Sequence, residues 1–199
     1  EPVKPEKQLG FVHHNVDCIG CRACEIACKD KNGLSAGPRF RRVQYVEGGT
    51  YPDVYAYKVN VSCNHCAEPA CLPACPTGAI WKRADNGIVD IDSTLCIGCR
   101  RCEATCPYGA PQWDPEEQIV KKCNLCVDEI EAGRLPECVM ACRMRVLDVG
   151  PFDLLRLNEY QTKAVGPNEE TVRAVKNFAD PELTNPSIVF VAHSKGRVD

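Results

Sequence analysis

The chain has 199 residues, and its length, composition and charge already exclude several classes of protein. Hydrophobic residues make up 44% and charged residues 26%, a balance that excludes a collagen-like or disordered chain. A formal net charge of -3 predicts no basic surface for nucleic acid. No apolar stretch approaches the roughly 18 residues that a membrane span needs. The exceptional feature is the set of 16 cysteines, which we expect to organise the fold.

In chain order, the predicted elements alternate short strands with groups of four cysteines. They are a strand over 9–13, group one (Cys18, Cys21, Cys24, Cys28), a strand over 55–61, group two (Cys63, Cys66, Cys71, Cys75), a strand over 87–91, group three (Cys96, Cys99, Cys102, Cys106), a strand over 118–122, group four (Cys123, Cys126, Cys138, Cys142) and a strand over 145–149. The last two cysteines of each group are expected to begin a short helix. Small strands and helices around cofactors predict an α+β fold that uses a ferredoxin-like module twice.

The segment 32–51 lies outside this alternation. It contains several glycines and three closely spaced arginines, Arg39, Arg41 and Arg42. Runs of charged residues are usually solvated in folded proteins. We therefore expect a solvated loop here rather than a binding site.

The tail beyond residue 150 has a different character, because it contains no cysteine. We expect helices over 152–160 and 169–180, the second capped by Asn168, and a strand over 187–192. Cluster binding needs no such tail. We interpret it as a docking or wrapping element, with a simple packing segment as the alternative.

The spacing of the cysteines carries the chemical prediction. Every group opens with two cysteines separated by two residues and closes with two separated by three. In groups one and three this makes the C-x2-C-x2-C-x3-C run of bacterial ferredoxins. Three thiolates of such a run can hold one iron–sulfur cluster, whereas the fourth lies about 6 Å further along a helix and points to the next cluster. Four groups therefore predict four [4Fe–4S] clusters.

The groups also form an internal repeat. Group one reads CIGCRACEIAC and group three reads CIGCRRCEATC, which are identical at 8 of 11 positions. Groups two and four share the opening Cys-Asn-x-Cys. Two compact groups thus alternate with two that carry an insertion, a pattern that indicates duplication of a two-group unit.

Two other uses of cysteine remain open at this point. Disulfide bonds could pair all 16 cysteines, and structural zinc also uses paired C-x2-C motifs. Three cysteines within seven residues, found twice, fit shared ligation of one cluster better than a set of disulfides. Zinc would not require the third and fourth cysteines at ferredoxin spacing. Because cysteine fills every ligand position, none of the histidines is needed on iron, and we expect them at the surface or around the ligands.

The segments SCNHCAEPACLPACPTGAI (62–80) and CIGCRRCEATCPYGAPQW (96–113) resemble the four-cluster iron–sulfur (beta) subunits of the dimethyl sulfoxide reductase family of molybdopterin oxidoreductases. The resemblance implies an electron-transfer subunit that is not catalytic alone. Its partners would be a molybdopterin-containing catalytic subunit and a quinone-reactive membrane anchor subunit. It would be membrane-associated through these partners on the extracytoplasmic face, with a cytoplasmic location as the alternative.

The resemblance also implies which cysteines share a cluster, a pairing that spacing alone leaves open. The four ligand sets would be Cys18, Cys21, Cys24 and Cys142; Cys28, Cys123, Cys126 and Cys138; Cys63, Cys66, Cys71 and Cys106; and Cys75, Cys96, Cys99 and Cys102. The chain would form a first module over 1–54 and 118–150, a second module over 55–117 and a tail over 151–199. A free-standing polyferredoxin is the alternative function, and a zinc-held scaffold is a third, non-redox reading.

Overall fold

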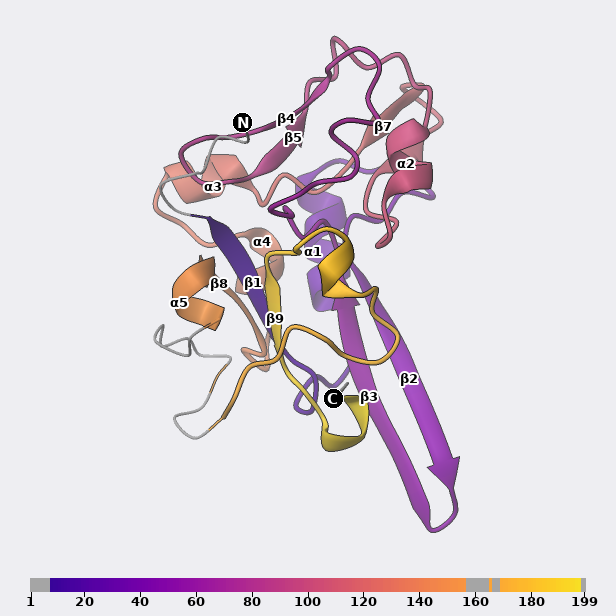
Figure 1. Cartoon of the computed structure of the whole chain (residues 1–199), viewed down its shortest axis with the longest axis vertical. Helices are drawn as coiled ribbons and strands as arrows, with labels where there is room; N and C mark the ends of the chain where they lie inside the picture. Colours follow the sequence, from indigo (N-terminus) through magenta and orange to yellow (C-terminus); the bar gives the residue numbers. More distant parts are fainter. Residues whose placement is uncertain (1–7, 157–164, 166–168, 198–199) are drawn as a thin grey trace.

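The computed structural model describes residues 8–156, 165 and 169–197, and it shows short strands and small helices (Figure 1). The strands are β1 (Leu9–His14), β2 (Arg42–Thr50), β3 (Asp53–Val61), β4 (Ile80–Lys82), β5 (Val89–Ile91), β6 (Gln112–Asp114), β7 (Ile119–Lys121), β8 (Leu147–Pro151) and β9 (Ile188–Val191). The helices are α1 (Ala23–Lys31), α2 (Arg101–Thr105), α3 (Val127–Glu131), α4 (Glu137–Met140), α5 (Phe152–Arg156) and the 3-10 helices η1 (Pro181–Leu183) and η2 (Ser194–Gly196). This mixture agrees with the predicted α+β class. Among the described residues, no helix has both the length and the apolar character to cross a membrane.

A three-stranded sheet holds the largest core. β1 lies in its middle, antiparallel to β8 and parallel to β9. Successive side chains of a strand point to opposite faces, so Phe11 packs with Phe190 on one face and Val12 packs with Phe152 of α5 on the other. Both faces of β1 are therefore covered. The strand predicted over 187–192 is confirmed as β9, which the tail contributes to this sheet.

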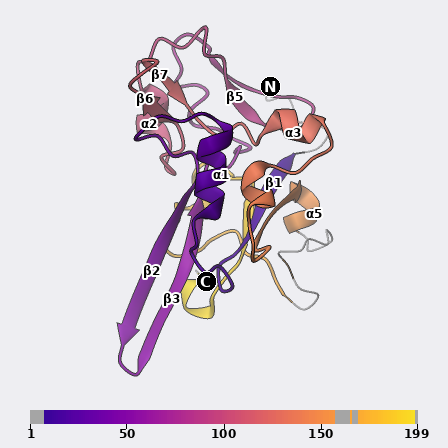
Figure 2. The ribbon, with the colours of Figure 1, turned by 180° about the vertical axis from the view of Figure 1, so that it is seen from behind.

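A long hairpin of β2 and β3 projects away from the rest of the molecule (Figure 1, Figure 2). The expected solvated loop over 32–51 is wrong for 42–50, because β2 pairs with β3 along its whole length, whereas 32–41 contains no helix or strand. Val43 and Val46 of β2 are buried, and Arg41, which precedes the strand, is only 2% exposed. From the local sequence these arginines looked like solvated side chains, because the residues that they contact in space are far away along the chain.

Two short ribbons lie at the end of the molecule opposite to the hairpin tip (Figure 1). β4 pairs with β5 and β6 pairs with β7, both antiparallel. The strands predicted over 87–91 and 118–122 correspond to β5 and β7. Their partners β4 and β6 are three residues long, too short to show a periodic pattern in the sequence.

The helices at the cysteine groups follow the prediction in three groups and depart from it in one. α1, α2 and α4 each begin one residue before the third cysteine of groups one, three and four. In group two, Cys71 lies in a turn and Cys75 follows that turn without helical structure. Pro73 and Pro76 explain this, because the residue before a proline disfavours helical backbone.

The tail contains less helix than predicted. The described residues 169–180 form no α-helix, since Val172 pairs with Phe190 and Val175 pairs with Arg197 in isolated bridges. Tertiary pairing has overridden a local preference for helix. The helix predicted over 152–160 is present over Phe152–Arg156; its remainder and Asn168 lie outside the described residues.

Candidate metal centres

The repeated sequence CIGCR folds in the same way in both copies. Gly20 and Gly98 have φ angles of 70° and 67°, and Arg22 and Arg100 both have a φ of 59°. A side chain at Gly20 would collide with the hydroxyl group of Tyr45, so backbone conformation and packing both require glycine there. The local sequence thus sets the same loop in front of α1 and α2.

In space the cysteines lie in four sets, each of which draws on two groups. The first set is Cys18, Cys21, Cys24 and Cys142; the second is Cys28, Cys123, Cys126 and Cys138; the third is Cys63, Cys66, Cys71 and Cys106; and the fourth is Cys75, Cys96, Cys99 and Cys102. The first, third and fourth sets each line a cavity, with about 350, 360 and 310 Å³ of space free of protein atoms, including space open to solvent. These are the foursomes that the resemblance implied, and ligation of a cluster by each stays a prediction.

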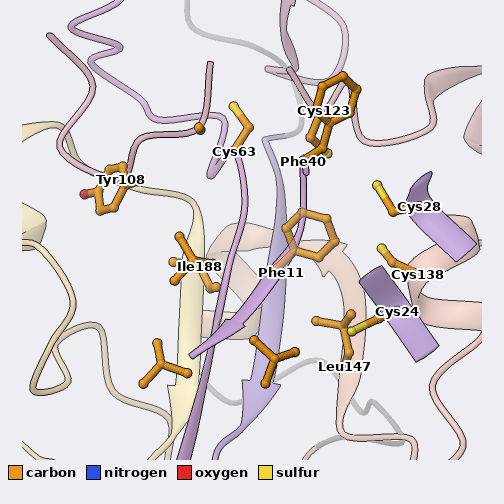
Figure 3. Packing of buried hydrophobic residues seen from close by; sticks show 14 of the residues in the cluster. Phe11, Cys24, Cys28, Phe40, Cys63, Tyr108, Cys123, Cys138, Leu147 and Ile188 are labelled. Carbon is orange, nitrogen blue, oxygen red and sulfur yellow. The ribbon is translucent and has the colours of Figure 1, made fainter. Parts of the chain in front are cut away.

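The second set is defined by its side chains. The Cys28 thiol on α1 interacts electrostatically with those of Cys123, Cys126 and Cys138, and all four are buried. α1 packs against α4, which carries Cys138. Figure 3 shows Cys24, Cys28 and Cys138 near one another. One turn of α1 therefore separates a cysteine of the first set from a cysteine of the second.

Beside the third set lie polar residues that the sequence analysis missed. Its cavity is also lined by Tyr108, Lys122 and Thr184. The hydroxyl groups of Tyr108 and Thr184 are hydrogen-bonded at 3.0 Å, and Thr184 also hydrogen-bonds the Cys66 thiol. The tail thus contributes a wall of this cavity, a contact that supports its alternative reading as a packing segment. The cysteine pattern contains no signal for Thr184, because the contact is entirely tertiary.

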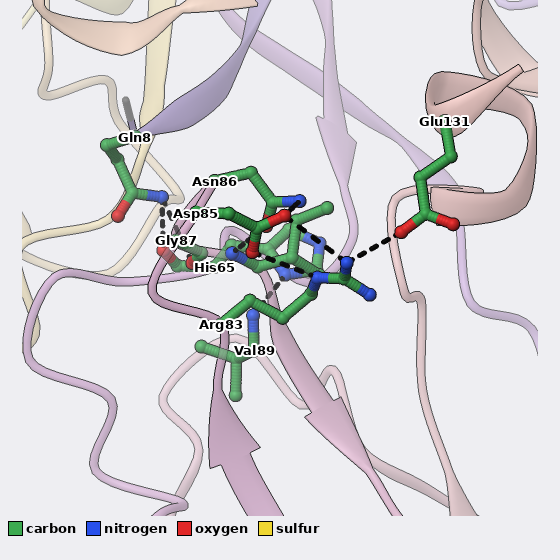
Figure 4. A network of polar contacts seen from close by, with 9 residues as sticks. Gln8, His65, Arg83, Asp85, Asn86, Gly87, Val89 and Glu131 are labelled. Carbon is green, nitrogen blue, oxygen red and sulfur yellow. Dashed lines mark hydrogen bonds and ion pairs between the residues drawn. The ribbon is translucent and has the colours of Figure 1, made fainter. Parts of the chain in front are cut away.

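Three of the four histidines, His13, His14 and His65, are buried. His13 and His65 are 0% and 1% exposed; His13 lines the cavity of the first set and His65 Nδ1 lies 4.0 Å from the Cys63 sulfur, so both lie around the ligands rather than at the surface. His65 Nδ1 accepts a hydrogen bond from the backbone N–H of Val89 at 3.1 Å (Figure 4), so the neutral ring carries its proton on Nε2. Burial lowers the pKa of His65 well below its usual range, and Lys122 lowers it further. His65 is therefore a neutral side chain held against β5.

Burial also governs the chemistry of the thiols. It raises the pKa of Cys66 and of Cys71 to about 12, and neighbouring thiolates act in the same direction. Burial likewise raises the pKa of Cys123 and of Cys126 to about 11. Four crowded thiols cannot all ionise near neutral pH unless a positive group balances their charge, and metal binding releases their protons. The sets therefore suit a cofactor that contains metal ions.

The donor sets fit iron–sulfur clusters. Within the part of the chain that the structure describes, no three His, Cys, Asp or Glu side chains converge closely enough to hold a single metal ion. Thiolates bind zinc at about 2.3 Å, so four of them close around the ion without an internal cavity. The first, third and fourth sets surround a cavity instead. Four cysteine thiolates are the ordinary ligands of a [4Fe–4S] cluster.

Comparison with protein families gives two matches. Residues 54–152 match the family described as a 4Fe-4S dicluster domain, and residues 17–33 match a 4Fe-4S binding domain. Together the two matched segments contain all four cysteine groups.

Several characterised proteins are similar over much or nearly all of the chain. The iron–sulfur subunit of anaerobic dimethyl sulfoxide reductase from Escherichia coli K12 is 43% identical over 198 residues, covering 96% of this chain and 91% of the relative. Its counterpart from Haemophilus influenzae is 37% identical, covering 96% and 93%. A sulfite dehydrogenase subunit from Allochromatium vinosum is 43% identical over 156 residues, covering 68% and 65%.

Proposed function

Because the protein belongs to the family of iron–sulfur subunits of anaerobic dimethyl sulfoxide reductase, we propose that it carries four [4Fe–4S] clusters and relays electrons between a molybdopterin catalytic subunit and a quinone-reactive membrane subunit. At the coarser level, the protein is an iron–sulfur electron-transfer subunit of an oxidoreductase and is not catalytic alone. The arrangement of the cysteines in four sets of four carries the finer proposal.

The contacts between sets support a linear order of clusters. Cys24 of the first set and Cys28 of the second lie on the same helix. Cys123 of the second set interacts electrostatically with Cys63 of the third. A further interaction joins Cys71 of the third set to Cys102 of the fourth, which completes the order first, second, third, fourth.

The exposure of the cysteines supports entry and exit of electrons at the two ends of this order. Cys21 of the first set and Cys99 of the fourth are the exposed cysteines, whereas the second set is buried throughout. Exposed apolar side chains stand beside both, Ile19 near Cys21 and Ile97 near Cys99. Exposed apolar side chains around a cysteine suit contact with a partner protein that excludes water. By family resemblance, the first set faces the catalytic subunit and the fourth faces the membrane subunit.

The proposal divides the chain into a first module over 1–54 and 118–150, a second module over 55–117 and a tail over 151–199. The pairing of β1 with β8 and the packing of α1 on α4 support the union of the two separated parts of the first module. The tail joins this module through β9. By the same resemblance, the protein would be held at the membrane through its partner, on the extracytoplasmic face.

Serine variants of the cluster-loaded chain test the sets. Cys28→Ser and Cys123→Ser should alter the same paramagnetic centre, whereas Cys18→Ser should alter a different one, because Cys24 and Cys28, one turn apart on α1, belong to different sets. Electron paramagnetic resonance of the reduced protein distinguishes the centres, and Cys63→Ser against Cys75→Ser is the matched pair elsewhere. If Cys18→Ser and Cys28→Ser convert one and the same centre, each group binds its own cluster and the proposed sets are wrong.

Metal analysis and native mass spectrometry distinguish the proposed function from the two alternatives, a zinc-held scaffold and a free-standing polyferredoxin. Four clusters require about 16 iron and 16 sulfide per chain, four of each per cubane. A colourless chain with stoichiometric zinc would refute the clusters altogether. A cluster-loaded chain that never co-purifies with a catalytic subunit would instead favour the free-standing polyferredoxin.

A further inference from the structure

Arg41 is a buried cation whose charge has no ordinary partner. Its side chain is 2% exposed, and its guanidinium lies 4.4 Å from the centre of the Phe11 ring. Nη1 donates a hydrogen bond of 2.7 Å to Oδ1 of Asn60. Nε and Nη2 are buried and have no nitrogen or oxygen partner among the described residues, whereas the Arg41 side chain hydrogen-bonds the Cys138 thiol. A buried charge with free donors is costly unless an anion lies beside it.

The groups around Arg41 are thiols of two cysteine sets. Its charge interacts with Cys24 of the first set and with Cys28, Cys123 and Cys138 of the second. Among the described residues, no carboxylate forms an ion pair with Arg41.

The base of the hairpin holds Arg41 against α1. The Glu25 carboxylate on α1 accepts a hydrogen bond of 2.5 Å from the backbone N–H of Val43, two residues after Arg41. Asn60, on the partner strand, accepts from Arg41 and donates from Nδ2 to the Cys24 sulfur at 3.5 Å. The guanidinium is therefore held between the first two sets from both strands of the hairpin.

We propose that Arg41 is the shared counter-charge and hydrogen-bond donor of the clusters in the first and second sets, and that it raises the reduction potentials of both. The inference rests on the proposed function, since it requires clusters there. Reduction of a [4Fe–4S] cluster adds one electron and no proton, so the cluster becomes more negative. A fixed positive charge beside it stabilises the reduced form, and hydrogen bonds to the sulfur atoms act in the same direction.

The other sets lack an equivalent residue. Lys122 is the other buried Lys or Arg side chain among the described residues, and it lies at the third set. Its Nζ is already bonded to the backbone oxygens of Val89 and Cys123, so it has fewer donors to offer. The cavity of the fourth set is lined by one cation, Arg100, which is exposed and paired with Glu103.

The test is a potentiometric titration of the cluster-loaded full chain, with each centre assigned by its serine variant. Arg41→Gln removes the charge, and Arg41→Lys retains the charge without the planar guanidinium and its several N–H donors. As a control, Arg83→Gln removes an equal charge from the surface. At a fixed ambient potential, we expect Arg41→Gln to lower the ratio of reduced to oxidised cluster about tenfold for the second set, a shift of about 59 mV for a one-electron centre. The first set should shift less, because one of its thiols lies near Arg41 rather than three, and Arg41→Lys should fall between.

The outcomes separate the inference from the proposed function. If four clusters are present and all centres keep their potentials in Arg41→Gln, or all four shift alike, the inference is wrong while the proposed function stands. If the variants assemble no clusters, wild-type protein labelled with ¹⁵N in the arginine guanidinium decides the matter. Hyperfine coupling of that nitrogen to the reduced centre of the second set supports the proposal, and its absence overturns it.

Discussion

The sheet region (β1, β8, β9, α1 and α4) and the ribbon region (β4 to β7 and α2) fill their interiors differently. In the sheet region, Phe11, Ile188 and Phe190 are fully buried together in a large cluster that also contains cysteines of α1 and α4. The buried cluster of the ribbon region is much smaller and consists of Cys71, Ile80, Val89, Cys102 and Val120. Two of these residues are cysteines of the third and fourth sets, so much of this interior belongs to whatever the thiols bind.

The comparison shows how one chain can combine two sources of stability. A sheet with both faces covered gains from burial of apolar surface. An isolated two-stranded ribbon is marginal in water, and metal ligation can then contribute folding free energy directly. The ribbon region should therefore depend on its clusters more strongly than the sheet region does.

Removal of the clusters should have the largest effect. After chelation and anaerobic removal of iron, we expect the chain to lose its cooperative fold, with amide protection lost first in β4 to β7 and last in β1 and β9. Hydrogen exchange with mass spectrometry measures this order. Equal and persistent amide protection in both regions would show that the protein folds without its clusters.

Truncation of one buried isoleucine in each region should have a smaller effect than cluster removal, and the loss of unfolding free energy should differ between the regions. Ile188 and Ile80 are 0% and 4% exposed, one in the sheet and one in a ribbon. We expect Ile188→Ala to reduce the free energy of unfolding by about 4 kcal/mol and Ile80→Ala by about 2 kcal/mol, because a cavity inside a sheet covered on both faces collapses less. Anaerobic denaturant unfolding of the loaded protein gives both values.

The control for this pair is Ile26 on α1, which is 67% exposed. Ile26→Ala should change the free energy of unfolding by no more than about 0.5 kcal/mol, since surface substitutions remove little packing. A larger loss for Ile80→Ala than for Ile188→Ala would reverse the comparison between the regions.

The ion pair that links the ribbons to α3 should contribute least. Arg83 donates to the Glu131 carboxylate at 2.6 Å and also pairs with Asp85 (Figure 4). Since Glu131 is 56% exposed, Arg83→Gln should cost at most about 1 kcal/mol, and the cost should shrink as salt is added. A double-mutant cycle with Glu131→Gln isolates the pair. A coupling above about 2 kcal/mol would mean that this contact, rather than the clusters, holds the ribbons in place.

The cysteine loops could be predicted because their conformation is local. Gly20 and Gly98 adopt nearly the same φ, and helices follow in both copies, since the chain's own neighbours decide these turns. The strands over 55–61 and 187–192 were likewise predictable from their composition. β2 was missed because its strand character became visible only through pairing with β3, and its two glycines and the arginines at and before its start resemble those of a loop.

The number, type and spacing of the metal donors can be predicted from the sequence. A cysteine thiolate is a soft metal ligand in any fold, and the C-x2-C spacing brings two thiols together within one loop. Which thiols meet is a different matter. Cys142 reaches Cys18, and Cys138 reaches Cys28, because β1 closes on β8 and α1 packs on α4 across more than a hundred residues. The burial of Arg41 follows from the same closure, since a charge can lie in the interior only where the fold gathers anions around it.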